Sequence, residues 1–467
     1  MSSTLGLHPM IKSVAAALLV LACASAAARS VPFAFPPTTG TVPMLALSDL
    51  RSTSVTAEER RILVVELRAK IDRMATVDVR TAPAEVFKGG LWAAGMLHDY
   101  GTTTVDAVRR VLRGDAPKGL DDPLVRDALE VAYAIRNPRA ELGNNVSAFV
   151  GTSRNAKHSA MAALALPFLV GESSRGLAAE ASDRLKSTYP EWKSHPILNR
   201  AIHDLSYRNR NTTTPLEELV AAPFPGNAVV GFSFQRQSYS YDRQNKYGRN
   251  NPGLTVVRGG DGRFVRQPGG SVFSIPHLAR SDSDMPGYLS NGNTPQGVFT
   301  VSGEDISRGN KFIGNTPFLW TELPFEADAA RYFHDPARAG TSWTLDIYKS
   351  LLPPNWRNHE PMMEAWYAGK AGRGEVIAHG TTIDPDYFKG QPWFPNSPSK
   401  GCLTALELWD PVTGQATHSD QAALINAWRT ATGSTDGKGF FVVVEIPGEG
   451  PVHLYEVLPA LMNAETK

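Results

Sequence analysis

The chain has 467 residues, of which 42% are hydrophobic and 20% are charged, and its formal net charge is +1. This length is sufficient for more than one domain, and this balance of residue types is that of a soluble globular protein. A net charge so close to zero argues against a nucleic-acid-binding protein, which needs a concentrated basic surface. Beyond the N-terminus no apolar run reaches the roughly 18 residues of a membrane-spanning helix, so we expect no membrane span.

The N-terminus has the pattern of a secretory signal peptide over residues 1–28. Lys12 supplies a positive charge, residues 14–23 form an apolar run too short to cross a bilayer, and small residues provide a cleavage site. We therefore expect an exported protein that works in the periplasm or the cell envelope. Lipid anchoring at Cys23 is the alternative, although Leu21 is large for a lipoprotein signal.

Residues 29–49 are rich in Pro, Thr and Ala and predict an extended leader, whereas the pattern over 50–206 is helical. Thr56 and Glu59 are spaced as a capping box, in which each side chain satisfies a free backbone amide at the start of a helix. Apolar residues then recur at helical spacing as far as Leu205, which predicts an all-helical domain over 50–206. These apolar stripes lie at 63–74, 124–135, 161–169, 177–185 and 197–205.

The polar segment 207–224 has no apolar period and predicts a linker, after which the pattern becomes that of strands. The glycine-rich segment 259–262 predicts a hairpin turn between strands at 254–257 and 263–266. Ser419 is placed to cap a later helix. The predicted fold class is therefore multidomain α+β, with an N-terminal all-helical domain followed by a mainly β domain over 225–467 that contains a few inserted helices. Further strands are predicted at 272–275, 297–301, 376–379 and 440–446.

Cys402 is the only cysteine that remains once the signal segment and Cys23 are set aside, so the exported chain has no partner for an intramolecular disulfide. Such a thiol is either a buried bystander or a nucleophile. A free thiol has a pKa near 8.5, so a nucleophilic cysteine needs a base that removes its proton. His379 ends a predicted strand upstream of Cys402 and is the candidate base.

The residues just before Cys402 predict a tight turn. Gly401 lets the backbone turn closely, and the amides of Lys400, Gly401 and Cys402 could then stabilise an oxyanion. Ser399 is either a simple turn residue or a supporting residue of the site. We expect the Lys400 ammonium group to be solvated rather than to stabilise a thiolate, because lysine is rarely buried without a partner.

Three motifs of this region resemble, in their order, those of the L,D-transpeptidase catalytic domain (the YkuD-like family). They are Thr294-Pro295-Gln296-Gly297, His379-Gly380-Thr381 and Ser399-Lys400-Gly401-Cys402. The chain departs from the family pattern in having Lys400 where the family usually has His, and Thr404 where Arg or Asn is common. The segment between His379 and Ser399 is also a few residues longer than usual, which indicates a divergent member.

The resemblance implies a β-rich enzyme that acts on peptidoglycan stem peptides without a metal or organic cofactor. It implies that Cys402 is the nucleophile and His379 the base, that the Gly380 backbone orients the imidazole, and that a carbapenem can acylate the thiol. The expected reactions are cross-linking of stem peptides or exchange of terminal D-amino acids. Two alternatives stay open: a carboxypeptidase or endopeptidase that hydrolyses the same bonds, and a non-catalytic protein that binds the cell wall.

Overall fold

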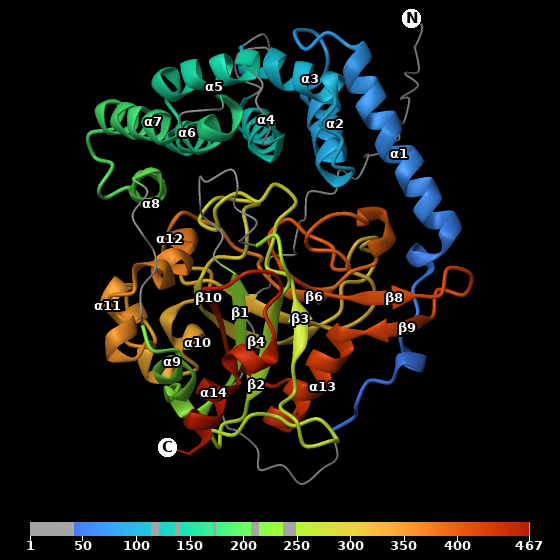
Figure 1. Cartoon of the computed structure of the whole chain (residues 1–467), viewed down its shortest axis with the longest axis vertical. Helices are drawn as coiled ribbons and strands as arrows, with labels where there is room; N and C mark the ends of the chain where they lie inside the picture. The colour runs from blue at the N-terminus through green and yellow to red at the C-terminus, as the bar shows by residue number, and fades with distance from the viewer. Residues whose placement is uncertain are drawn as a thin grey trace, which may run out of the picture. The chain divides into compact units, whose positions relative to one another are not determined.

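The computed structural model describes residues 42–113, 121–135, 140–170, 174–206, 214–236 and 249–466 (Figure 1). Helices and strands both contribute, so the predicted mixed α and β character is confirmed. The predicted signal peptide, with Cys23, lies outside the described residues, as do most of the predicted leader and the first part of the predicted linker.

The helix predicted from the Thr56 capping pattern is α1 (Ala57–Thr76). The Thr56 side chain accepts a hydrogen bond from the Glu59 amide, which confirms the Thr56 half of the predicted capping box, and the burial of Leu67, Ile71 and Met74 confirms the apolar stripe. The following helices are α2 (Ala84–Met96), α3 (Thr102–Leu112), α4 (Asp121–Ile135), α5 (Ala140–Thr152), α6 (Ala156–Val170), α7 (Ser174–Thr188) and α8 (Pro196–Leu205).

Helix α6 is the central element of this helical array. Nearly all of its residues from His158 to Leu169 are buried, and it packs against α4, α5, α7 and α8. A helix that is apolar on all sides is stable only where neighbours cover every face, which explains this central position. The buried apolar residues of this array form one continuous hydrophobic cluster with those of the sheet.

The larger sheet has the strand order β3-β2-β1-β10-β4-β5-β6-β7. Its central strands β1 (Val229–Arg236) and β10 (Gly439–Ile446) are parallel, and β1 is buried along its whole length. The pair β6 (Ala378–Gly380) and β7 (Leu403–Ala405) is also parallel, whereas the other neighbouring strands are antiparallel. The remaining strands are β2 (Gly253–Arg258), β3 (Ile275–His277), β4 (Gly297–Asp305) and β5 (Phe318–Glu322).

The two edges of this sheet meet. Leu278, directly after β3, forms an antiparallel bridge with Thr404 of β7, and the two residues exchange both backbone hydrogen bonds at 2.9 and 2.8 Å. The sheet is therefore closed nearly into a barrel, and β7 is paired on both sides instead of presenting a free edge. A separate hairpin, β8 (Glu407–Trp409) and β9 (Ala416–Ser419), follows β7 (Figure 1).

Several predicted elements differ from the structure. Residues 263–266 were expected to form a strand after the glycine turn, but Phe264 and Arg266 make only isolated bridges, because the main partners of β2 are β1 and β3. The predicted linker 207–224 contains a short helix, α9 (Leu216–Ala221), among its described residues. The predicted Ser419 cap is confirmed, since its hydroxyl accepts a hydrogen bond from Ala422 at the start of α13 (Asp420–Thr432). The other helices here are α10 (Ala329–Tyr332), α11 (Leu345–Lys349), α12 (Glu364–Lys370) and α14 (Leu454–Glu465).

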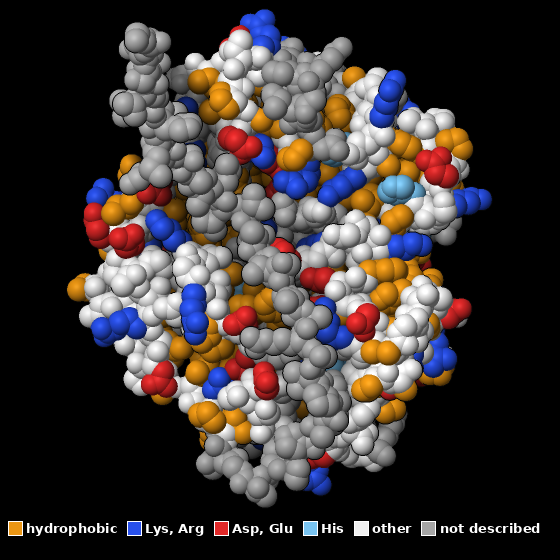
Figure 2. Space-filling view, turned by 180° about the vertical axis from the view of Figure 1, so that it is seen from behind, with side chains coloured by type: hydrophobic (Ala, Val, Ile, Leu, Met, Phe, Trp, Pro, Cys, Tyr) orange, Lys and Arg blue, Asp and Glu red, His pale blue; other side chains and the backbone are white. Residues whose placement is uncertain are grey.

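None of the helices in the described part of the chain combines the length and the apolar character needed to cross a bilayer. On the face shown in Figure 2, Lys and Arg side chains are interspersed with Asp, Glu and apolar side chains. This mixture fits a chain whose positive and negative residues are nearly balanced.

Candidate active site

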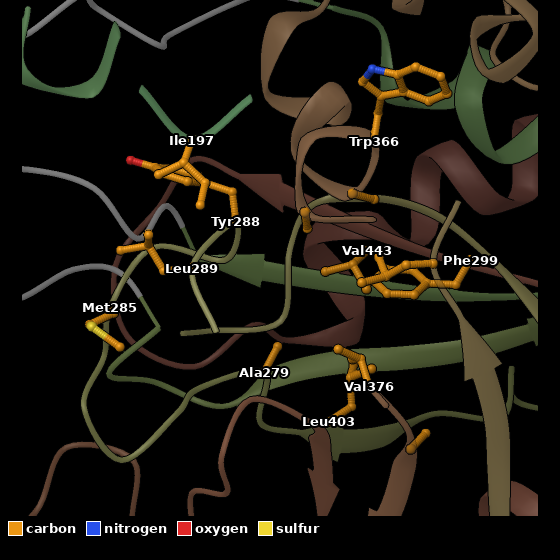
Figure 3. Packing of buried hydrophobic residues seen from close by; sticks show 14 of the residues in the cluster. Ile197, Ala279, Met285, Tyr288, Leu289, Phe299, Trp366, Val376, Leu403 and Val443 are labelled. Carbon is orange, nitrogen blue, oxygen red and sulfur yellow. The ribbon is translucent and has the colours of Figure 1, made fainter. Parts of the chain in front are cut away.

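Strands β6 and β7 bring His379 and Cys402 to neighbouring positions. In their parallel register Ala378 faces Leu403 and His379 faces Thr404, so Cys402, one residue before β7, lies level with Ile377. Side chains on a strand alternate between faces, and direct partners share a face. The backbone of Cys402 therefore lies beside the strand that carries His379, two residues from the position level with the imidazole. Figure 3 shows Val376 and Leu403 among the buried residues where these strands begin.

The imidazole of His379 is buried and held by its own strand. Its Nδ1 lies 2.6 Å from the carbonyl oxygen of Gly380. Because a carbonyl only accepts, Nδ1 carries the proton, and in the neutral ring Nε2 is left as the acceptor. Burial lowers the pKa of His379 to about 4, although the bond to Gly380 acts in the opposite direction. At neutral pH the ring is thus uncharged, and its Nε2 carries no proton.

The thiol of Cys402 is partly exposed and is not in a disulfide. Its sulfur lies 3.6 Å from the carbonyl oxygen of Glu375, to which the thiol donates. Glu375 has a left-handed backbone with a φ of 61°, and its amide donates to the Glu326 carboxylate at 2.7 Å. The position of this carbonyl beside the sulfur is therefore fixed by Glu326.

The turn before Cys402 is closed by the Ser399 hydroxyl. Its oxygen accepts from the Gly401 amide at 3.0 Å and donates to the Cys402 carbonyl at 3.0 Å. Ser399 is thus a structural member of this turn. The Gly401 amide, expected as an oxyanion donor, is committed to the turn, which corrects that part of the prediction. The amides of Lys400 and Cys402 remain the candidate donors.

Gly401 sits where no other residue fits. Its φ is 117°, and a Cβ placed on it would lie 2.2 Å from the carbonyl oxygen of Gly292. The Gly401 carbonyl accepts from the Thr294 hydroxyl at 2.9 Å, so the Thr-Pro motif contacts the cysteine turn directly. The buried Arg373 guanidinium donates to the carbonyls of Gly292 at 2.7 Å and Gly401 at 3.4 Å. These contacts join the turn to the loop before β4.

Lys400 is not solvated as its residue type suggested. Its ammonium nitrogen lies 2.7 Å from a carboxylate oxygen of Glu130 on α4 and 2.8 Å from one of Asp282. Burial alone lowers the pKa of a lysine, but the two carboxylates outweigh it and hold the pKa of Lys400 above its ordinary value. Lys400 therefore stays positively charged and is held between the carboxylates of Glu130 and Asp282, beside the turn Ser399–Cys402 (the cysteine turn).

Sequence reasoning missed two buried titratable residues near His379. His277 of β3 donates or accepts at 2.8 Å with the Thr255 hydroxyl, and burial together with the nearby His379 lowers its pKa to about 3. The carboxyl group of Glu407 packs against Gly380, and burial raises its pKa to about 8. Neither residue belongs to a local motif. Arg373 was missed for the same reason, since its partners lie far from it in the sequence.

In comparisons with known proteins, no family model, no curated protein sequence and no solved structure matches this chain. The assignment of a function therefore depends on the residues of the site and on the motif resemblance alone.

Proposed function

We propose that this chain is an exported, cysteine-dependent L,D-transpeptidase that acts on peptidoglycan stem peptides. The observation that supports this best is the parallel pairing of β6 and β7, which brings Cys402, one residue before β7, beside the strand that carries His379, whose imidazole is oriented by the Gly380 carbonyl. A partly exposed thiol next to the strand that carries a neutral, oriented imidazole is suited to acyl transfer. The substrate class comes from the motif resemblance.

In the proposed acylation step, the thiol leaves the Glu375 carbonyl by rotation about χ1 and transfers its proton to Nε2 of His379. The sulfur attacks the carbonyl carbon of the bond between diaminopimelate and D-alanine. The amide of Cys402 stabilises the oxyanion that forms. The C–N bond then breaks, the imidazolium returns its proton to the leaving amine, and D-alanine departs from a thioester on Cys402.

The thioester is resolved by an amine from a second stem peptide or from a free D-amino acid. Neutral His379 accepts a proton from the attacking amine and passes it to the sulfur as the thioester bond breaks. The product is a cross-link or an exchanged terminal residue, and the thiol is regenerated. Attack by water instead of an amine gives hydrolysis by the same residues.

The proposal divides the chain into two domains. We assign residues 225–467 to a mainly β catalytic domain, and 50–206 to an N-terminal helical domain that is joined to it. The residues proposed to act on the substrate, Cys402 and His379, and Gly380, which orients the imidazole, all lie in the β part. Residues 1–28 direct export to the periplasm or cell envelope in this proposal.

Product analysis tests the proposal. Purified protein is incubated with disaccharide-tetrapeptides, with and without a D-amino acid, and the products are separated and weighed by mass spectrometry. The expected products are cross-linked dimers or exchanged tetrapeptides that require Cys402. Tripeptide as the sole product favours the hydrolase, and no product with any of these substrates contradicts an enzymatic function.

A further inference from the structure

The ion pair between Lys400 and Glu130 connects the cysteine turn to the helical array. Glu130 is buried on α4, and its second carboxylate oxygen accepts from the Asn291 amide group at 2.9 Å. Its first oxygen holds Lys400 at 2.7 Å, only two residues before the thiol. Gly95 near the end of α2 covers the pair, since a Cβ built there would lie 3.4 Å from Asp282 and 3.7 Å from the Lys400 nitrogen. Helices α2 and α4 thus surround this ion pair.

The long segment between His379 and Ser399 makes a second connection to the same helices. The Tyr387 hydroxyl donates to the Leu97 carbonyl at 3.1 Å, directly after α2. The ring of His98 lies 5.5 Å from that of Phe388 and 5.8 Å from that of Trp393. Trp393 is almost fully buried. The additional residues of this segment therefore pack against the helical array.

Other hydrogen bonds also join the helical array to the loop that contains Asp282. Tyr288 donates to Asp204 of α8 at 2.7 Å, and Lys157 of α6 donates to Ser290 at 2.6 Å. Tyr288 and Ser290 belong to the same loop as Asp282, which also contacts the cysteine turn. Both sides of these contacts lie within one compact unit, Thr38–Lys467.

We propose that Lys400 is a positioning residue whose ion pair with Glu130 fixes the Ser399–Cys402 turn. Helices α2 and α4 thereby help to position the Cys402 thiol. The inference rests on the proposed function for its reaction but assigns a role that the motifs do not contain. A lysine held between two carboxylates fixes the backbone of its own turn, and Gly401 transmits that position to Cys402. A displacement of about 1 Å at a reacting atom costs up to a hundredfold in rate, so this anchor is expected to affect the thiol.

Alkylation of Cys402 by iodoacetamide in the full-length protein measures this role without any peptidoglycan substrate. The variants are Glu130→Gln, Lys400→Gln and the double variant, with Glu360→Gln as the control. Glu360 forms an ion pair with Arg200 of α8 and so joins the same two regions away from the thiol. The rate is measured from pH 6 to pH 10, and the melting temperature of every variant is measured alongside it.

Each single variant is expected to lower the alkylation rate at pH 7 about tenfold, with little change at pH 10, where the thiol ionises without help. The double variant is expected to match Lys400→Gln, because Glu130 has no lysine left to pair with once Lys400 is replaced. The control is expected to alkylate like the wild type. Glu130→Gln keeps the pair between Lys400 and Asp282, so it decides the result if Lys400→Gln does not fold.

An unchanged rate at pH 7 in a folded Glu130→Gln protein overturns the inference, as do equal losses at pH 7 and pH 10. A wild-type rate at pH 7 that His379→Gln leaves unchanged overturns the proposed pair of Cys402 and His379 instead. A third outcome is that Cys402 is alkylated faster at pH 7 in the wild type than in Glu130→Gln, but that no peptidoglycan product forms. In that case the positioning role of Lys400 stands and the substrate assignment fails.

Discussion

The carboxyl group of Glu407 lies directly against the α-carbon of Gly380. A Cβ added to Gly380 would be 2.1 Å from the Glu407 carboxyl carbon, far inside van der Waals contact. Gly380 also supplies the carbonyl that holds His379. The buried Glu407 carboxyl group and the imidazole of His379, the proposed base, are therefore connected through one glycine. The absence of a side chain at Gly380 lets β6 pack against β8.

Gly380→Ala is expected to lower the free energy of unfolding by about 1–3 kcal/mol, because the new methyl group overpacks a site that Glu407 fills. It is also expected to slow acylation of Cys402, since relief of the clash moves the Gly380 carbonyl. Urea unfolding and the carbapenem acylation rate measure the two effects. Gly269→Ala is the control, because nothing lies near a Cβ at that position. Equal behaviour of the two variants would refute this explanation.

Glu407 gives the protein a pH-dependent stability. Burial is the main cause that raises its pKa from an ordinary 4.5 to about 8, so the folded protein keeps a proton that the unfolded chain releases. Its contribution is complete below pH 4.5 and is lost as the pH rises through about 8. In Glu407→Gln this contribution is absent, so the variant gains stability relative to the wild type between pH 5 and pH 8. Urea unfolding at several pH values tests this, and a constant difference between the two proteins contradicts it.

The buried imidazole of His379 makes the protein less stable as the pH falls, whereas Glu407 makes it less stable as the pH rises. Burial lowers its pKa from 6.5 to about 4, so the unfolded chain binds a proton that the folded protein refuses. The stability linked to this group is present above pH 6.5 and is lost as the pH falls through about 4. We expect His379→Gln to lose less stability than the wild type between pH 6.5 and pH 4. The comparison uses unfolding curves at both ends of that range, and parallel losses in the two proteins count against a buried neutral imidazole.

The contact between Thr294 and Gly401 predicts a coupled loss of stability and reactivity. Thr294→Val keeps the shape of the side chain but removes the hydroxyl that donates to the Gly401 carbonyl. We expect a loss of about 1 kcal/mol in the free energy of unfolding together with slower acylation of Cys402. Thr430→Val removes a similar hydroxyl-to-carbonyl bond on the exposed face of α13 and should change neither quantity measurably. Faster acylation of Thr294→Val would show that this bond does not support the turn.

Elements with local signals were predictable from the sequence. The hydroxyls of Thr56 and Ser419 cap α1 and α13 because both lie directly before apolar residues at helical spacing. Strand β1 was missed, because its Gln235 and Arg236 resemble solvent-exposed residues. Arg236 is buried only because Glu456 and the carbonyls of a distant turn, 447–451, surround it. A single segment gives no sign of such partners.

The same reasoning explains what was found and missed in the candidate site. Cys402 and His379 stand in short motifs, so they could be singled out from residue types and order. Glu130, more than two hundred residues before Lys400, could not be, and Lys400 was therefore expected to be solvated. The use of the Gly401 amide inside the turn depends on the Ser399 rotamer, which the sequence does not encode locally.

The most direct test of the acyl-transfer proposal is the mass of the intact protein after brief mixing with a disaccharide-tetrapeptide. The predicted result is a covalent adduct equal to the substrate without its terminal D-alanine, located on Cys402 by peptide mapping and absent from Cys402→Ser. His379→Gln should form the same adduct much more slowly at neutral pH. An unmodified Cys402 under conditions where the protein is folded and the thiol can be alkylated would contradict the proposal.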